Sequence, residues 1–194
     1  MAIEFLATMR SSIFEGKIFA HFFIGGDQHR GFDFSSATAQ EINEYLTIGP
    51  TADWVELIDR PTQDFVLGNG RDINYLLVDK QLKYSDTDAE RYARYVEQLL
   101  SPNAVERSST ISVDFDPAYQ TVAFHRLLRI RDGEETDILD PSRFGLFRIE
   151  TDREKLIYNG TLQLSYLIPD VRVGDVLDYS LQSAVETLRS DHIT

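Results

Sequence analysis

The stretch TVAFHRLLRIRDGEETDI, residues 121–138, combines a strand-like run with a turn signal. Its first half is rich in β-branched and other apolar residues, and Arg131 is followed directly by Asp132 and Gly133. An Asp-Gly pair favours a tight hairpin, because glycine adopts a positive φ at little cost and aspartate tolerates one. The stretch therefore predicts two antiparallel strands that meet at Asp132 and Gly133, the second running toward Ile138.

Similar runs occur on both sides of this stretch. From about residue 50 onward, β-branched and aromatic residues alternate with polar ones and are divided by turn residues, which is typical of antiparallel β domains. One run ends at Asp116 and Pro117, and Asn159 and Gly160 form a second hairpin signal. The sequence therefore predicts a mainly β fold. The strand-like runs are NYLLVDKQLKY (74–84), STISVDF (109–115) and KLIYNGTLQLSYLI (155–168).

The stretch IPDVRVGDVLDYSLQ, residues 168–182, indicates either a carboxylate-lined site or a turn. Pro169 marks the end of a strand, because proline cannot donate to a sheet ladder. Gly174 and Asp175 are typical of a turn or bulge. We therefore interpret its acids, Asp170 among them, as turn residues. The positions expected in the core are Val171, Val173, Val176 and Tyr179.

The segment DTDAERYARYVEQLL, residues 86–100, has no clear local assignment. Thr87 and Glu90 have capping-box spacing, and propensity alone slightly favours a helix. As a strand, the segment would place Arg94 and Gln98 on the same side as apolar residues. The residues near one helical face are Tyr92, Tyr95, Val96 and Leu99.

The N-terminal residues contain an apolar run, 18–24, of the kind found in secretory signals. Acidic residues offset the basic ones, His21 interrupts the run, and no A-x-A-like cleavage site follows. We therefore expect a helix that ends at Gly25 and Gly26. TAQEINEYL, residues 38–46, is compatible with a second, short helix. The apolar face of the first helix would contain Leu6, Met9 and Ile13.

Composition limits the classes of function. The 194 residues suffice for one domain with a sizeable core, and 42% of them are hydrophobic. The formal net charge of -13 argues against binding to nucleic acid or anionic lipid. No apolar run approaches the roughly 20 residues that a transmembrane helix needs. The chain has no cysteine, which excludes disulfides, thiolate metal sites and a cysteine nucleophile.

The sequence contains no recognisable catalytic, cofactor or metal motif. There is no Gly-x-Ser-x-Gly elbow, and an isolated His125 in a strand is more often structural than catalytic. Asp114 and Asp116 would share one side of a strand, but two carboxylates do not specify a calcium site. Asn159-Gly160-Thr161 matches a glycosylation acceptor, although a hairpin explains the Asn-Gly pair. The histidines without metal-ligand spacing are His21, His29 and His192.

Four motifs in order carry a family resemblance. They are FDPAYQ (115–120), FHRLLRIRDG (124–133), YNGTLQL (158–164) and PDVRVGDVLDYS (169–180). Together with ADWVEL (52–57), they extend the similarity over residues 52–182. This region resembles the bacterial domain of unknown function found N-terminal to transglutaminase-like domains in exported proteins. The family normally continues into that catalytic domain, so we expect a truncated polypeptide.

The resemblance implies a β-sandwich related to immunoglobulin-like folds, with RYARYVEQLL as a strand. We expect an N-terminal segment at 1–49, the sandwich at 50–185, and a tail or linker at 186–194. The implied function is a noncatalytic accessory domain of a transglutaminase-like enzyme. The implied location is periplasmic or otherwise exported, although the residues do not exclude the cytoplasm. Two alternatives stay open: an independent carbohydrate- or peptide-binding sandwich, and a hydrolase with two carboxylates.

Overall fold

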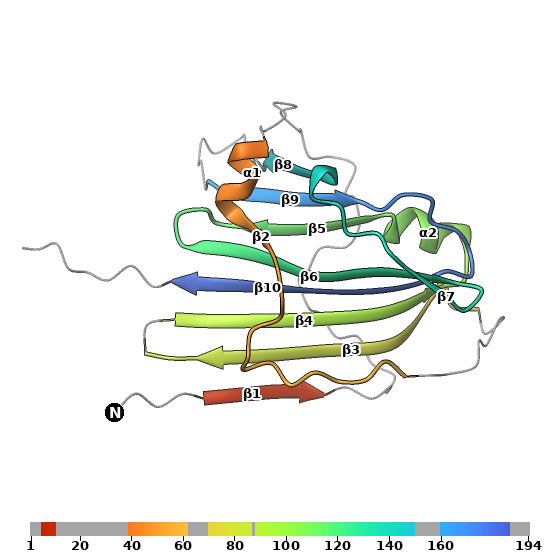
Figure 1. The fold of residues 1–194 in the computed structure, drawn as a ribbon, viewed down its shortest axis with the longest axis horizontal. Coiled ribbons are helices and arrows are strands. Elements are labelled where there is room, and N and C mark those ends of the chain that lie inside the picture. The colour runs from red at the N-terminus through yellow and green to blue at the C-terminus, as the bar shows by residue number, and fades with distance from the viewer. Residues whose placement is uncertain (1–4, 11–38, 62–69, 87, 150–159, 187–194) are drawn as a thin grey trace, which may run out of the picture.

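The computed structural model describes residues 5–10, 39–61, 70–86, 88–149 and 160–186, which form two β-sheets (Figure 1). The large sheet has seven strands in the order β1-β3-β4-β10-β6-β2, with β7 also paired to β6. The small sheet has the order β5-β9-β8. The strands of the large sheet are β1 (Phe5–Arg10), β2 (Leu46–Ile48), β3 (Ile73–Tyr84), β4 (Asp88–Leu99), β6 (Gln120–Arg131), β7 (Glu134–Asp137) and β10 (Val176–Glu186). Those of the small sheet are β5 (Thr110–Phe115), β8 (Phe144–Arg148) and β9 (Leu162–Leu167).

The predicted mainly β, sandwich-like fold is confirmed. The stretch 121–138 forms the antiparallel strands β6 and β7. Asp132 and Gly133 connect them with φ values of 52° and 82°. Two successive positive φ values give the turn a twist that matches its flanking strands. This local geometry explains the use of an Asp-Gly pair.

The segment with helical propensity, residues 86–100, contains strand β4, so the helix alternative is wrong. β4 pairs with β3 on one side and with β10 on the other. Residues 92–99 are all buried, because both faces of this central strand are covered. Tertiary pairing therefore outweighs the helical propensity of this segment.

The hydrophobic core lies between the two sheets. Phe124 of β6, Phe144 of β8 and Tyr166 of β9 pack edge to face, with successive ring centroids 4.9 and 4.8 Å apart. Tyr95 and Tyr179 stack on neighbouring strands, with centroids 5.4 Å apart. We call the side of the large sheet that faces this core the inner face, and the opposite side the outer face.

The N-terminal segment departs from expectation in two ways. Residues 5–10 form β1, an edge strand antiparallel to β3, so the helix predicted there is wrong for these residues. Ile13, Gly25 and Gly26 lie outside the described residues. β2 is parallel to β6, so the large sheet is mixed and not wholly antiparallel. β1 and β2 thus precede the predicted domain start at residue 50 but belong to the same sheet.

Short helices complete the described fold. α1 (Ala39–Tyr45) lies in the segment compatible with a helix, and α2 (Pro102–Ser108) connects β4 to β5. A single 3-10 turn spans Pro141–Arg143. The side chain of Ser101 caps α2 by accepting from the backbone N–H of Ala104 at 3.1 Å. Of the helices in the described ranges, none has the length and apolar character that a membrane crossing requires.

Candidate interaction surface

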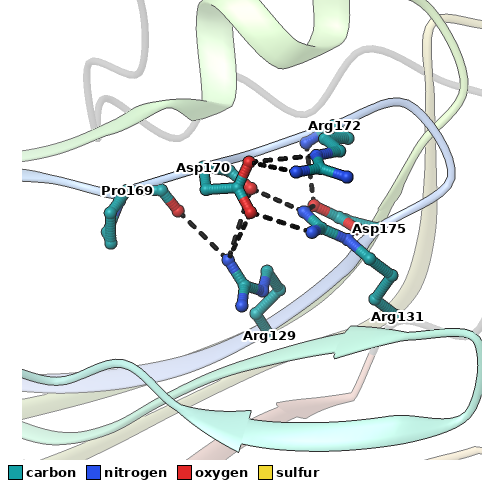
Figure 2. A network of polar contacts seen from close by, with 6 residues as sticks. All are labelled: Arg129, Arg131, Pro169, Asp170, Arg172 and Asp175. Carbon is teal, nitrogen blue, oxygen red and sulfur yellow. Dashed lines mark hydrogen bonds and ion pairs between the residues drawn. The ribbon is translucent and has the colours of Figure 1, made fainter.

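The turn between β9 and β10 is held by a buried aspartate (Figure 2). Asp175 is 1% exposed, and its carboxylate accepts from Nε and Nη2 of Arg131 at 2.7 and 2.9 Å. It also accepts from the backbone N–H of Arg172 at 2.8 Å. Gly174 has a φ of 96°, and its N–H donates to the carbonyl of Leu99 at 2.7 Å. Asp175 therefore closes the turn and also anchors it to β6.

Asp170 forms the exposed part of the same network. Its carboxylate accepts from Nη1 of Arg131 and from Nε of Arg172, both at 2.9 Å. Hydrogen bonds from these two arginines lower the pKa of Asp170. The carbonyl of Pro169 accepts from Nη1 of Arg129 at 3.4 Å. The motifs FHRLLRIRDG and PDVRVGDVLDYS are therefore joined by ion pairs, as Figure 2 shows.

The core positions expected in this stretch are only partly correct. Val176 and Tyr179 are buried, and Val171 packs against the core. Val173 is 49% exposed, so its assignment to the core is wrong. It lies in the turn between β9 and β10, where side chains do not alternate between two sheet faces.

The turn after β5 has a local explanation. The side chain of Asp116 accepts from the backbone N–H of Ala118 at 2.9 Å, and Pro117 lies between them. Asp114 is exposed and accepts from Nε2 of Gln163 at 2.7 Å. These contacts favour the turn and strand-face interpretation over a calcium site. Within the described ranges, no three histidine, aspartate or glutamate residues are grouped as metal ligands would be.

His125 and Gly160, two other residues noted in the sequence, lie in different parts of the fold. Nδ1 of His125 lies 2.9 Å from the carbonyl of Gly49, which ties β6 to the residue after β2. Within the part of the chain that the structure describes, no acidic or nucleophilic side chain forms a hydrogen bond with this imidazole. Gly160 precedes β9 with a φ of 68°. Asn159 lies outside the described residues, so the predicted Asn-Gly turn stays a prediction.

The segment after β2 covers part of the outer face, and it begins with a turn at Asp53 and Trp54 that the N–H of Val55 closes by donating to the carbonyl of Ala52 at 3.0 Å. Residues 51–61, which we call the strap, cross β10, β4 and β3 (Figure 1). The side-chain amide of Gln81 pairs with the main chain of Glu56: Nε2 donates to its carbonyl at 2.7 Å, and Oε1 accepts from its N–H at 2.9 Å. Nη1 of Arg94 donates to the carbonyl of Ile58 at 2.6 Å. Main-chain contacts therefore hold the strap on the sheet.

A buried ion pair lies beneath the strap. Nε and Nη2 of Arg94 donate to the two carboxylate oxygens of Asp178, both at 2.9 Å. The side chains are 6% and 0% exposed. Burial alone lowers the pKa of Arg94, but hydrogen bonding to Asp178 and its charge reverse the direction and raise it. Arg60 and Arg126 approach Asp178 at 3.8 and 3.7 Å, and Arg60 also pairs with Glu135.

Sequence reasoning missed this pair. Arg94 entered it only as an argument against a strand, and Asp178 only as one acid of a turn-rich stretch. The two residues are 84 positions apart in the sequence. A charged residue inside an otherwise apolar strand is a signal for a buried partner, but it does not identify that partner.

The inner face carries a second buried carboxyl. Glu97 is 2% exposed and shares the inner face of β4 with Tyr95 and Leu99. Burial raises its pKa to about 7, although the Ser108 side chain and the charge of Arg107 act in the opposite direction. Its Oε2 has no hydrogen-bond partner among the described residues. This side chain is therefore poised between its neutral and charged forms near neutral pH.

The strand ends around the end of β10 form a surface that we call the exit edge. Val185 of β10 pairs with Ala89 of β4 and with Gln120 of β6. Tyr84 pairs with Ala89 across the β3–β4 hairpin, and Tyr119 precedes Gln120. Tyr84 and Tyr119 are 43% and 42% exposed. Two exposed tyrosines therefore flank the point where the chain leaves the sheet.

Comparison with known proteins identifies a family but no activity. Residues 85–188 match the profile of the family described as Domain of Unknown Function with solved-structure structure (DUF3857). No curated protein matches the chain. A crystal structure described as a "putative protease" from Parabacteroides distasonis is similar at 14% identity with a TM-score of 0.45. The match covers 52% of this chain and 20% of that one, so the similarity spans about a fifth of that protein.

Proposed function

Because the chain belongs to the DUF3857 family, we propose that it is a noncatalytic domain that docks onto a transglutaminase-like catalytic domain. The order of its motifs, which resembles that of domains preceding such enzymes, supports the choice of partner. Transglutaminase-like chemistry uses a cysteine thiolate, and this chain has no cysteine. We therefore expect the chain alone to have neither amide-transfer nor peptide-hydrolysis activity. The proposal includes an exported location, which cell fractionation tests.

The observation that carries the docking proposal is the position of two tyrosines beside the end of β10. We propose that a catalytic domain on the C-terminal side of this one docks at the exit edge and contacts Tyr84 and Tyr119. Tyrosine is enriched among the residues that dominate binding energy at protein interfaces. Contacts between domains of one chain typically bury about 600–1,500 Å² and are fairly polar. Such a contact depends on a few anchors of this kind.

The test compares three samples: the catalytic domain alone, the two domains tethered in one polypeptide, and an untethered mixture. We expect tethering to raise the unfolding midpoint of the catalytic domain or to change its turnover. The double variant Tyr84→Ala/Tyr119→Ala removes this effect. The untethered pieces associate weakly, because separation removes the effective concentration that the linker supplies.

Tyr75→Ala is the matched control. Tyr75 is also 43% exposed, but it lies on β3 opposite Glu97, far along the strand from Tyr84. Its substitution leaves the tethering effect intact once any change in the stability of the isolated chain has been measured. The proposal fails if tethering changes neither quantity and titration detects no association at high micromolar concentration.

A further inference from the structure

The strap is recognised mainly through its peptide groups. Gln81 binds both the N–H and the carbonyl of Glu56, and Arg94 binds the carbonyl of Ile58 two residues later. Alternate residues of an extended chain turn the same way, so the two contacts lie on one side of the strap. N–H and carbonyl groups occur in nearly every peptide. The recognition therefore depends little on the strap's sequence.

The side chains of the strap add three more specific features, the first of which is a hydrogen bond from Nε1 of Trp54 to Glu90 at 2.8 Å. Among residues 51–61, all of which the structure describes, only Val55 is buried. Leu57 is 67% exposed. Arg60 reaches Asp178 on β10 and Glu135 on β7. Beyond the main chain, the strap thus offers a hydrogen-bonding indole, a buried small apolar side chain and, five residues after the latter, a cation.

The receptor groups are also held by partners on the sheet itself. Nε2 of Gln81 also donates to Oδ2 of Asp79 at 2.9 Å, and the guanidinium of Arg94 is fixed by Asp178. Gln81 and Arg94 are 0% and 5% exposed. Side chains fixed in this way lose little conformational freedom on binding, which favours recognition of an extended segment.

We propose that the outer face of the large sheet is a binding site for an extended peptide, and that the strap occupies this site in cis. The ligand is an extended segment of a partner protein with a small apolar residue followed five positions later by arginine or lysine. This site adjoins the exit edge only at Trp54 and Glu90, and it does not depend on docking of a catalytic domain. The tethered strap competes at an effective concentration of about millimolar, so an external peptide binds weakly until the strap is loosened.

Trp54 makes the exchange measurable. It is the only tryptophan in the chain, it belongs to the strap, and its Nε1 donates to Glu90 at 2.8 Å. A peptide of residues 51–61 with phenylalanine in place of Trp54 is silent when tryptophan is excited selectively. We expect its addition to the full chain to give a saturable red shift of Trp54 emission as the strap leaves the sheet. In Val55→Ala, the midpoint of the titration falls at least tenfold.

Two changes test main-chain reading. Methylation of the peptide nitrogen at the Glu56 position removes the hydrogen bond to Gln81 and weakens displacement at least tenfold. Gln81→Leu in the full chain removes these bonds from the strap and from the peptide alike, so in that variant the methylated and unmethylated peptides displace the strap equally well. Circular dichroism verifies that each variant is folded. If Val55→Ala does not fold, the titration uses the unmodified chain at a higher peptide concentration. The proposal is overturned if the methylated peptide displaces the strap of the unmodified chain as well as the unmethylated peptide does. It is also overturned if neither the unmodified chain nor Val55→Ala shows any displacement of the strap.

Discussion

Strands β4 and β10 bury a carboxyl group on each face of the large sheet, and the surroundings of the two groups differ. On the outer face, Asp178 is 0% exposed and accepts hydrogen bonds from Nε and Nη2 of Arg94. On the inner face, Glu97 is 2% exposed, and burial raises its pKa to about 7. A buried carboxyl group needs either a charged partner or a proton. One pair of strands shows both outcomes.

The difference follows from what covers each face. The inner face packs against the aromatic and aliphatic core, which favours the neutral form of an acid. The outer face carries Arg94 and Arg126 and is crossed by the strap with Arg60, so three arginines approach Asp178. We therefore expect removal of the outer carboxylate to be costly because it leaves Arg94 buried without its partner, and the contribution of the inner carboxyl to depend on pH.

The largest expected effect is that of Asp178→Ala. It leaves Arg94 buried without its partner, and we expect a loss of about 3 to 5 kcal/mol in the free energy of unfolding. Denaturant melts measure it. The double variant Arg94→Met/Asp178→Leu recovers most of this loss, because an apolar pair replaces a charged one, but it lacks the donor to Ile58. A single variant as stable as the unmodified chain contradicts the assigned role of the pair.

The next effect is a pH dependence caused by Glu97. Its folded-state pKa lies above the ordinary value of 4.5, so the folded state keeps a proton that the unfolded state has lost. Stability from this group is complete below about pH 4.5, falls as the pH rises to about 7, and then levels off. One pKa unit corresponds to about 1.4 kcal/mol, so the total change is roughly 3 kcal/mol.

Glu97→Gln is the matched control for that dependence. The amide does not titrate, so the difference in unfolding free energy between the variant and the unmodified chain changes across this pH window. Denaturant melts at several pH values measure the difference. A difference that is constant over the window indicates that Glu97 keeps its charge in the folded state, and the contrast between the two faces is then wrong.

Asp175→Asn tests an ion pair whose exposure to solvent is intermediate between that of the buried Arg94–Asp178 pair and that of the exposed pairs of Asp170. Asp175 is as buried as Asp178, but its partner Arg131 is 25% exposed. The amide loses the charge-assisted hydrogen bonds to Arg131, and we expect a cost of about 2 kcal/mol. This cost exceeds the one expected if Asp175 acted only as a hydrogen-bond acceptor within the turn. Thermal or denaturant melts of Asp175→Asn and Asp178→Ala side by side show whether the solvent access of the arginine sets the order.

Gly174→Ala separates backbone strain from ion pairing in the same turn. The φ of 96° strains any side chain, while no atom lies within 4 Å of an added Cβ. We expect a cost of about 1 kcal/mol, close to that of other L residues in left-handed backbone. Gly49→Ala is the control, since its Cβ also meets open space and its φ is not positive. Equal stabilities for the two variants contradict the strained turn.

The smallest effect is expected for Asp170→Asn. Asp170 makes as many ion pairs as Asp178, but it is 50% exposed, and solvent screens its contacts with Arg131 and Arg172. We expect an unfolding midpoint within experimental error of the unmodified chain at moderate salt. A loss comparable to that of Asp175→Asn shows that the network acts as one unit.

Features with local causes were predictable from the sequence. Asp132 and Gly133 connect β6 and β7 with two positive φ values, which neighbouring residues alone encode. Gly174 follows the same logic. β4 was not predictable in this way, because its propensity favours a helix, and only the family resemblance indicated a strand. Its partners lie on β3 and on β10, and the latter is far away in the sequence.

Features with distant causes were missed or wrong. Residues 5–10 were expected in a helix, but pairing with β3 makes them an edge strand. Likewise, ADWVEL (52–57) gave no indication that it crosses a sheet. The strap depends on Gln81 and Arg94, whose side chains project from β3 and β4. Asp170 and Asp175 of PDVRVGDVLDYS lie between β9 and β10, yet Asp178 in the same motif belongs to the buried pair.

The position of β10 has a consequence for how the protein is made. It is the last strand that the structure describes, yet it lies between β4 and β6. Until its residues leave the ribosome, β4 and β6 each lack a neighbour and present open edges of the kind that promote aggregation. Native sheet closure therefore waits for nearly the whole described chain to emerge. A nascent chain that stalls before residue 176 is thus a strong candidate for binding by chaperones.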